Sequence, residues 1–207
     1  FIFVLILGML WGSFANVCIV RLPKDKGVIS GRSSCPKCKK KISWYDNIPF
    51  ISYILLRGKC RNCNKEISIQ YLIVELLTAL FFFIEYFYFG LSLTTVLLFI
   101  LTLALIIIFF IDLKHFIIPN TLTFPLMFIG FIKSFDPNLN NFLFPNYINS
   151  LIGGVIGYLI IWLIILAYKK IRNKEGMGLG DAKLLSAIGF WFGWYSIPYV
   201  IFLSSLS

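Results

Sequence analysis

Long apolar runs dominate the chain and alternate with short polar stretches. A helix needs about 20 apolar residues to cross the ~30 Å hydrocarbon core of a bilayer. The runs therefore predict membrane-spanning helices, at residues 1–20, 69–89, 91–111, 117–132, 148–168 and 182–203. The predicted fold class is an all-α polytopic membrane protein with at least six transmembrane helices. Because the last run breaks off in Ser204–Ser207 without a polar tail, we expect a C-terminally truncated core.

Basic residues gather in one segment and orient the chain. Residues 21–68 hold 12 Lys and Arg but only three acidic residues, a net +9 of the chain's +10. If this segment is cytoplasmic, alternation of the spans leaves Lys133 alone on the outer side, as the positive-inside rule demands. We therefore predict three domains: a first transmembrane helix at 1–20, a cytoplasmic domain at 21–68 and a membrane-embedded core at 69–207.

Four of the five cysteines form two C-x2-C pairs, Cys35 with Cys38 and Cys60 with Cys63. Two such pairs provide the four thiolates of a closed, structural Zn²⁺ site. A cytoplasmic location argues against disulfides. A segment of this size also has too small an apolar core to fold without a bound metal or a cross-link. The sequence predicts structural zinc at these cysteines, with unmetallated thiols as the alternative.

Two aspartates lie where predicted spans meet the cytoplasmic face. Asp112 follows the run 91–111, and Asp181 precedes the run 182–203 at the end of the stretch Gly176-Met177-Gly178-Leu179-Gly180-Asp181. Either carboxylate alone could be a simple helix end or cap. Together they also suit a proton-coupled transporter, although such sites lie near the middle of the bilayer. A membrane zinc adaptor without catalysis is a further alternative.

Two glutamates lie in the run 69–89. Glu85 is near its outer end and is expected to reach the interface with its side chain. Glu75 is near the inner end, where a structural role, pairing with a basic residue and a place in a site all remain open.

The motifs taken together resemble the bacterial type IV prepilin peptidases, which are membrane aspartyl proteases of the Gly-x-Gly-Asp kind. The resemblance spans essentially the whole chain. It rests on six stretches of this sequence, namely residues 12–17, 21–23, 35–63, 74–76, 112–120 and 176–183. Asn120 departs from the pattern, because bacterial members commonly have Asp there.

The resemblance implies two activities. Such enzymes cut the basic leader from prepilins or pseudopilins of type II secretion at the cytoplasmic face of the bacterial inner membrane. Many then methylate the new N-terminal amine with S-adenosylmethionine. Asp112 and Asp181 match the catalytic pair, and Gly58 and Lys59 match the region associated with methyl transfer.

Helix polarity predicts how two such aspartates divide the work. The N-terminus of a helix favours an anion and the C-terminus disfavours one, so Asp181 is the expected base and Asp112 the expected acid. Gly178 and Gly180 would let an extended substrate backbone lie against their loop. The positive domain has the wrong sign to attract a basic leader, so we expect it to lie on anionic lipid headgroups, with no nucleic-acid partner.

Overall fold

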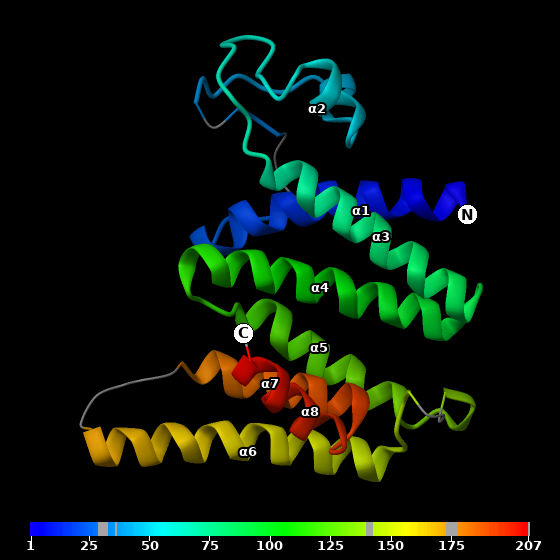
Figure 1. Cartoon of the computed structure of the whole chain (residues 1–207), viewed down its shortest axis with the longest axis vertical. Helices are drawn as coiled ribbons and strands as arrows, with labels where there is room; N and C mark the ends of the chain where they lie inside the picture. Colours follow the sequence, from blue (N-terminus) through cyan, green and yellow to red (C-terminus); the bar gives the residue numbers. More distant parts are fainter. Residues whose placement is uncertain (29–32, 36, 140–142, 173–177, 207) are drawn as a thin grey trace. The chain divides into compact units, whose positions relative to one another are not determined.

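The computed structural model describes residues 1–28, 33–35, 37–139, 143–172 and 178–206. Within these ranges the regular elements are helices (Figure 1), and the only strand-like pairing is two isolated β-bridges. The all-helical class is therefore confirmed. The chain divides into two units, Phe1–Phe116 and Ile117–Ser207. Unit 1 contains α1 (Ile2–Arg21), η1 (Leu22–Lys24), η2 (Trp44–Asn47), α2 (Ile51–Leu55), α3 (Gln70–Phe89) and α4 (Leu93–His115). Unit 2 contains α5 (Asn120–Lys133), η3 (Pro137–Leu139), α6 (Tyr147–Arg172), α7 (Leu179–Phe192) and α8 (Ser196–Leu206).

Four of the described helices are long and apolar enough to cross a membrane, namely α1, α3, α4 and α6. At most 39% of the residues in their apolar windows are buried inside the protein. The remaining apolar side chains face outward, as expected of helices whose solvent is lipid. These four helices confirm the predicted spans at 1–20, 69–89, 91–111 and 148–168.

Close packing of α1 against α3 organises unit 1. A Cβ at Gly12 would lie 2.7 Å from the Cα of Glu75, so only glycine allows the two backbones this approach. One turn further along α1, the Asn16 side chain reaches the carbonyl of Tyr71, one turn back along α3. The two helices therefore run antiparallel, and Glu75 lies in their interface.

The segment between α1 and α3 carries the four paired cysteines and the short helix α2 (Figure 1). It has little regular structure. Each cysteine pair is followed by a left-handed residue, Lys39 with φ 57° and Asn64 with φ 51°. A positive φ also occurs at Phe50, immediately before α2, and at Gly58, three residues after it.

Unit 2 is built around α7, which packs against both α5 and α6. Small residues allow the α6 contact, and the Ser186 hydroxyl donates to the Gly154 carbonyl at 2.8 Å. On its other side, the Trp191 indole donates to the Leu126 carbonyl of α5 at 2.8 Å. Helix α5 has only 14 residues, about 21 Å, which is shorter than the predicted span 117–132 needs for a full crossing.

The predicted sixth span at 182–203 is wrong as a single helix. Helix α7 ends at Phe192, because Gly193 adopts φ 78° and its N–H bonds back to the Gly189 carbonyl. Helix α8 then folds back, so that Ile197 packs with Ala182 and Leu185 near the start of α7. Trp194 and Tyr195 continue the apolar pattern through the turn, which hides the break in a hydropathy profile.

Candidate active site and metal centre

The two cysteine pairs adopt the same local backbone structure, 25 residues apart. In the first, the Cys35 N–H donates to the Lys40 carbonyl at 3.0 Å and Ser34 bridges Lys41. In the second, the Cys60 N–H donates to the Lys65 carbonyl at 2.9 Å and Lys59 bridges Glu66. Each forms a tight loop that presents two sulfurs on one side, as metal knuckles do.

The four sulfurs converge in a geometry that fits a tetrahedral metal. The Sγ atoms of Cys35, Cys38, Cys60 and Cys63 all lie within 4.8 Å of one another. The Cys35 and Cys63 sulfurs are 3.9 Å apart, and all four residues are free thiols. Four sulfurs bound to one Zn²⁺ at ~2.3 Å would be about 3.8 Å apart. The cluster therefore suits a four-thiolate metal site.

The backbone prepares the two leading cysteines for metal binding. The N–H of Cys38 lowers the pKa of the Cys35 thiol to about 6. The N–H of Cys63 likewise lowers the pKa of the Cys60 thiol. Hydrogen bonds to sulfur stabilise the thiolate, which is the form that binds metal.

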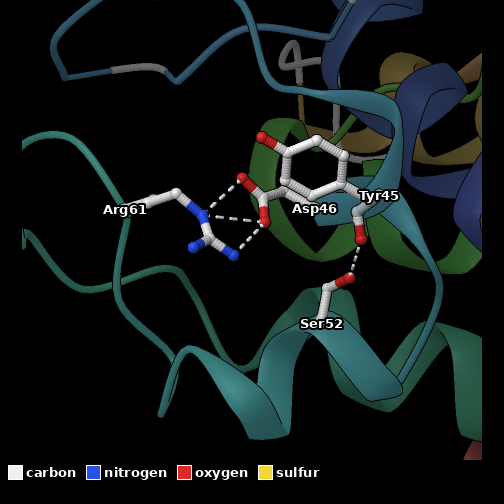
Figure 2. A network of polar contacts seen from close by, with 4 residues as sticks. All are labelled: Tyr45, Asp46, Ser52 and Arg61. Atoms are coloured by element: carbon white, nitrogen blue, oxygen red, sulfur yellow. Dashed lines mark hydrogen bonds and ion pairs between the residues drawn. The ribbon is translucent and has the colours of Figure 1, made fainter.

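An ion pair joins the second knuckle to the loop before α2. The Arg61 guanidinium, next to Cys60, contacts both carboxylate oxygens of Asp46, with 2.7 Å between Nη2 and Oδ1 (Figure 2). The Ser52 hydroxyl, in α2, donates to the Tyr45 carbonyl of the same loop at 2.8 Å (Figure 2). The metal knuckle, the loop and α2 are thereby connected through polar contacts.

A cavity of about 970 Å³ lies in unit 1 between the cysteine segment and the membrane helices. Its lining combines residues of the knuckles, of α2, of the C-terminal part of α1 and of the N-terminal part of α3. Lys114 of α4 lines it too, two residues after Asp112. The end of α4 that carries Asp112 therefore lies on the same side of unit 1 as the cysteine segment, as the alternation of spans predicts.

Gly58 and Lys59, matched by resemblance to the methyl-transfer region, both line this cavity. Gly58 has φ 67°, and a Cβ there would lie 3.0 Å from the Tyr53 hydroxyl of α2. Glycine is thus required by both the backbone and the neighbouring ring. The turn that it forms presents Lys59 at the start of the second knuckle.

Glu75 anchors the other end of α2. Its carboxylate accepts a hydrogen bond from the Phe50 N–H at 2.8 Å, and the Ser13 hydroxyl also bonds to it. Phe50 has φ 61° and ψ −54°, a strained conformation for a residue with a bulky side chain. Glu75 is 7% exposed and belongs to the cavity wall. One of the roles left open for Glu75 was pairing with a basic residue. The structure excludes this as the only role, because the carboxylate bonds to a backbone N–H and to a hydroxyl.

Asp112 and Asp181 occupy the predicted helix ends. Asp112 lies in the last turn of α4, and its carbonyl accepts the Phe116 N–H at 2.9 Å. Asp181 lies in the first turn of α7, in unit 2. Both are partly buried. Glu85 of α3 accepts a hydrogen bond from the Thr102 hydroxyl of α4, so its carboxylate joins these two helices.

The turn that carries Asp181 contacts the segment just after Asp112 in sequence. A Cβ at Gly180 would lie 2.9 Å from the Cβ of Ile118, which gives this glycine a packing role. The Lys183 ammonium donates to the Asn120 Oδ1 at 2.7 Å. Among the described residues, a Cβ at Gly178, the N-cap of α7, would meet only the Gly180 backbone nitrogen, at 3.8 Å. Gly176 and Met177 lie outside the described residues.

Asp181 lies beside the middle of α6 and not beside its basic end. Ala182, its neighbour, packs with Ile161 of α6. Ile161 precedes the basic residue Lys169 by eight residues, or about 12 Å along the helix axis. Within unit 2, Asp181 therefore lies about two helical turns along α6 from its basic end.

Comparison with known proteins decides the family. Residues 6–89 match the family model of the bacterial peptidase A24 N-terminal domain, and residues 99–207 match that of the type IV leader peptidase family. The chain belongs to the type IV leader peptidase family. No solved structure matches it.

Three curated relatives in this family are named prepilin leader peptidase/N-methyltransferase. The one from Neisseria gonorrhoeae is 37% identical over 97% of this chain and 77% of its own length. The one from Pseudomonas aeruginosa is 36% identical over 98% of this chain and 76% of its own length. The one from Vibrio cholerae is 39% identical over 97% of this chain and 81% of its own length.

The two family models divide the candidate residues between them. The N-terminal domain match contains the four cysteines, Gly58, Lys59 and Glu75, whereas the leader peptidase match contains Asp112 and Asp181. Sequence reasoning missed the roles of Phe50 and Asn16. Asn16 belongs to a recognised motif, but only its contact with Tyr71 and its place in the cavity wall reveal a function for the side chain.

Proposed function

We propose that the protein cleaves the basic leader from prepilins or pseudopilins at the cytoplasmic face of the bacterial inner membrane. It then methylates the new N-terminal amine. The observation that carries this proposal is similarity over nearly the whole chain to enzymes named for both activities. Two consecutive family models covering residues 6–89 and 99–207 support it.

Asp112 and Asp181 supply the peptidase chemistry in this proposal. A water held between two carboxylates attacks the scissile carbonyl while one carboxylate takes its proton and the other protonates the leaving amine. Like charges at one site cannot both ionise readily, so the pair shares a proton. Asp181, at a helix N-terminus, is the base, and Asp112, at a helix C-terminus, is the acid.

Within unit 2, local contacts hold the turn that carries Asp181. Gly180 and Lys183, on either side of Asp181, contact Ile118 and Asn120, which follow Asp112 by six and eight residues. Gly178 and Gly180, which carry no side chains, would let an extended substrate backbone lie against the head of α7.

Zn²⁺ held by Cys35, Cys38, Cys60 and Cys63 has a structural role in this scheme. The spacing of the sulfurs supports four thiolate ligands, which leave no open coordination position for catalysis. The metal would fix the two knuckles and, through Arg61 and Asp46, the loop before α2.

S-adenosylmethionine is the proposed methyl donor, bound in the cavity beside Gly58 and Lys59. The cavity volume of about 970 Å³ is ample for a nucleoside-sized ligand and part of a peptide. In the reaction the amine lone pair attacks the methyl carbon, the C–S bond breaks, and its electron pair stays on sulfur.

The membrane arrangement follows the sequence-based domains. Residues 1–20 form the first span, residues 21–68 the cytoplasmic domain and residues 69–207 the membrane core. In this proposal the shorter helices α5, α7 and α8 are embedded in the membrane beside the four long spans. The basic domain rests on anionic headgroups, where each exposed Lys or Arg contributes ~1 kcal/mol. In the full chain, replacing Lys39, Lys40 and Lys41 by Gln should weaken the association of residues 21–68 with anionic lipid. Unchanged lipid association would contradict this.

The experiment that tests the function mixes detergent-solubilised protein with a model prepilin and follows its mass. We expect loss of the leader first and a gain of one methyl group second, the latter only with S-adenosylmethionine present. A prepilin that keeps its leader after prolonged incubation would contradict the proposed function.

A further inference from the structure

One wall of the unit 1 cavity carries a buried acceptor that the protein itself does not use. Asn16 is 2% exposed and lines the cavity from α1. Its Nδ2 donates to the Tyr71 carbonyl at 3.0 Å, which fixes the amide orientation because a carbonyl can only accept. Among the described residues, its Oδ1 has no hydrogen-bond partner. Buried polar atoms are rarely left in this state, so the site is suited to an external donor.

The Glu75 carboxylate lies on the same wall with acceptor capacity to spare. It accepts from the Phe50 N–H and the Ser13 hydroxyl, whereas an ionised carboxylate offers about four lone-pair sites. Gly12 packs on Glu75 and Asn16 on Tyr71, so Glu75 and Asn16 are four residues, or about 6 Å, apart along the axes of adjoining helices.

The rest of the cavity has the opposite charge. Its lining contains eight Lys or Arg residues and three acids. Of the acids, Asp46 is paired with Arg61, and Glu66 is exposed. Glu75 is therefore the buried acid in a basic cavity. Together with the free Oδ1 of Asn16 it forms a small region that only accepts hydrogen bonds and carries negative charge. Such a region is complementary to an ammonium group, which only donates.

We propose that Glu75 and Asn16 form the subsite for the new N-terminal amine of the cut pilin during methyl transfer. This inference rests on the proposed function. The substrate's own N-terminus is favoured because both residues project from membrane helices, beside the membrane face at which the proposed function cuts the leader. Gly58 and Lys59, proposed above to lie beside the methyl donor, are at the other end of α2.

The subsite also accounts for the proton. The terminal ammonium gives one proton to the Glu75 carboxylate and becomes a neutral amine. Its lone pair attacks the sulfonium methyl group, the C–S bond breaks with its electron pair left on sulfur, and a secondary ammonium forms. Glu75 then releases its proton to water as the product leaves.

The test compares Glu75→Gln with wild type, using a pre-cut pilin peptide and its N-acetylated form. Glutamine keeps an acceptor for the Phe50 N–H but removes the charge. We expect wild-type protein to bind the free amine about 10- to 100-fold more tightly than the acetylated peptide, and Glu75→Gln to lose this preference. Methyl transfer should fall with a raised KM for the peptide, while S-adenosylmethionine binding and leader cleavage stay unchanged.

Two further variants separate binding from structure. Glu85→Gln changes the other glutamate of α3, which bonds to Thr102 away from the cavity, and should preserve the preference for the free amine. Asn16→Ala should reduce that preference in the same direction as Glu75→Gln. If wild type methylates the peptide and Glu75→Gln retains full preference and rate, the subsite is refuted while the proposed function stands. Loss of donor binding instead would assign Glu75 to S-adenosylmethionine and also refute it, and a wild type that never methylates would refute both.

Discussion

Arg61 holds Asp46 through both carboxylate oxygens, with Nη2 2.7 Å from Oδ1 and Nε 2.9 Å from Oδ2. The Asp46 side chain is only 10% exposed, whereas that of Arg61 is 56% exposed. The pair raises the pKa of Arg61, chiefly through its hydrogen bonds to Asp46. Because Arg61 lies between the two cysteines of the second knuckle, this contact joins the metal site to the loop that precedes α2.

Replacing Asp46 by Ala should loosen the second knuckle. Supporting contacts around metal ligands typically affect metal retention by tenfold or more, so we expect zinc loss to a chelator to accelerate about tenfold. Asp25→Ala, which removes an exposed acid from the same segment, is the matched control and should release zinc at the wild-type rate. Equal rates for the Asp46 and Asp25 variants would disprove the role of the ion pair.

A Cys60→Ser variant should lose bound zinc and destabilise residues 21–68, because three thiolates and a hydroxyl bind the metal poorly. Some leader cleavage should remain, since no step of the peptidase reaction uses the metal. Metal content per protein is the measurement. Cys18→Ala removes the fifth cysteine, a buried packing residue of α1, and should keep its zinc. Full metal content in the Cys60 variant would exclude this ligand set.

The sequence predicts what local patterns encode. Apolar length locates α1, α3, α4 and α6, and the spacing of the cysteine pairs predicts the sulfur cluster that the fold brings together. The sequence does not predict the helix break at Gly193, because apolar residues continue across it.

The sequence also does not predict contacts between residues that are far apart along the chain. The bond between Glu75 and the strained Phe50 joins residues 25 apart, and the acceptor at Asn16 depends on how α1 and α3 cross. Neither contact leaves a periodic signal, since both are set by tertiary packing.

Lys133 should stabilise unit 2 by holding the end of α7. Its ammonium donates to the Trp191 carbonyl at 2.8 Å and lies 3.8 Å from the centre of the Phe144 ring, with 5% of the residue exposed. Lys133→Met should lower the free energy of unfolding by about 1.5–3 kcal/mol, as for other hydrogen bonds to charged groups. Thermal unfolding in detergent would measure it, with the exposed Lys170→Met as control. An unchanged melting temperature would contradict the assignment.

The proposed topology predicts which positions are accessible from outside the cell. Single cysteines placed at Pro137 or Pro145 should react with an impermeant label in intact cells. Those at Lys39 or Lys170 should react only after permeabilisation, because the basic segments lie inside. The opposite pattern would place the cysteine domain and Asp112 on the wrong side for a cytoplasmic leader.

The aspartate pair has the clearest chemical requirement. An amide in place of either carboxylate keeps size and hydrogen bonding but can neither accept nor supply the proton that hydrolysis needs. Asp112→Asn and Asp181→Asn should therefore each abolish cleavage while the protein stays folded and zinc-loaded. Methyl transfer to a pre-cut peptide should survive in both, since the residues proposed for it lie in the N-terminal domain match. Asp136→Asn, at an aspartate that follows α5, is the matched control.

The most direct measurement follows the mass of a model prepilin incubated with these three variants and wild type. The proposed mechanism predicts complete leader removal by wild type and Asp136→Asn, and an intact leader with Asp112→Asn and with Asp181→Asn. Cleavage at a near wild-type rate by either of the latter two would show that the aspartate pair does not carry the reaction.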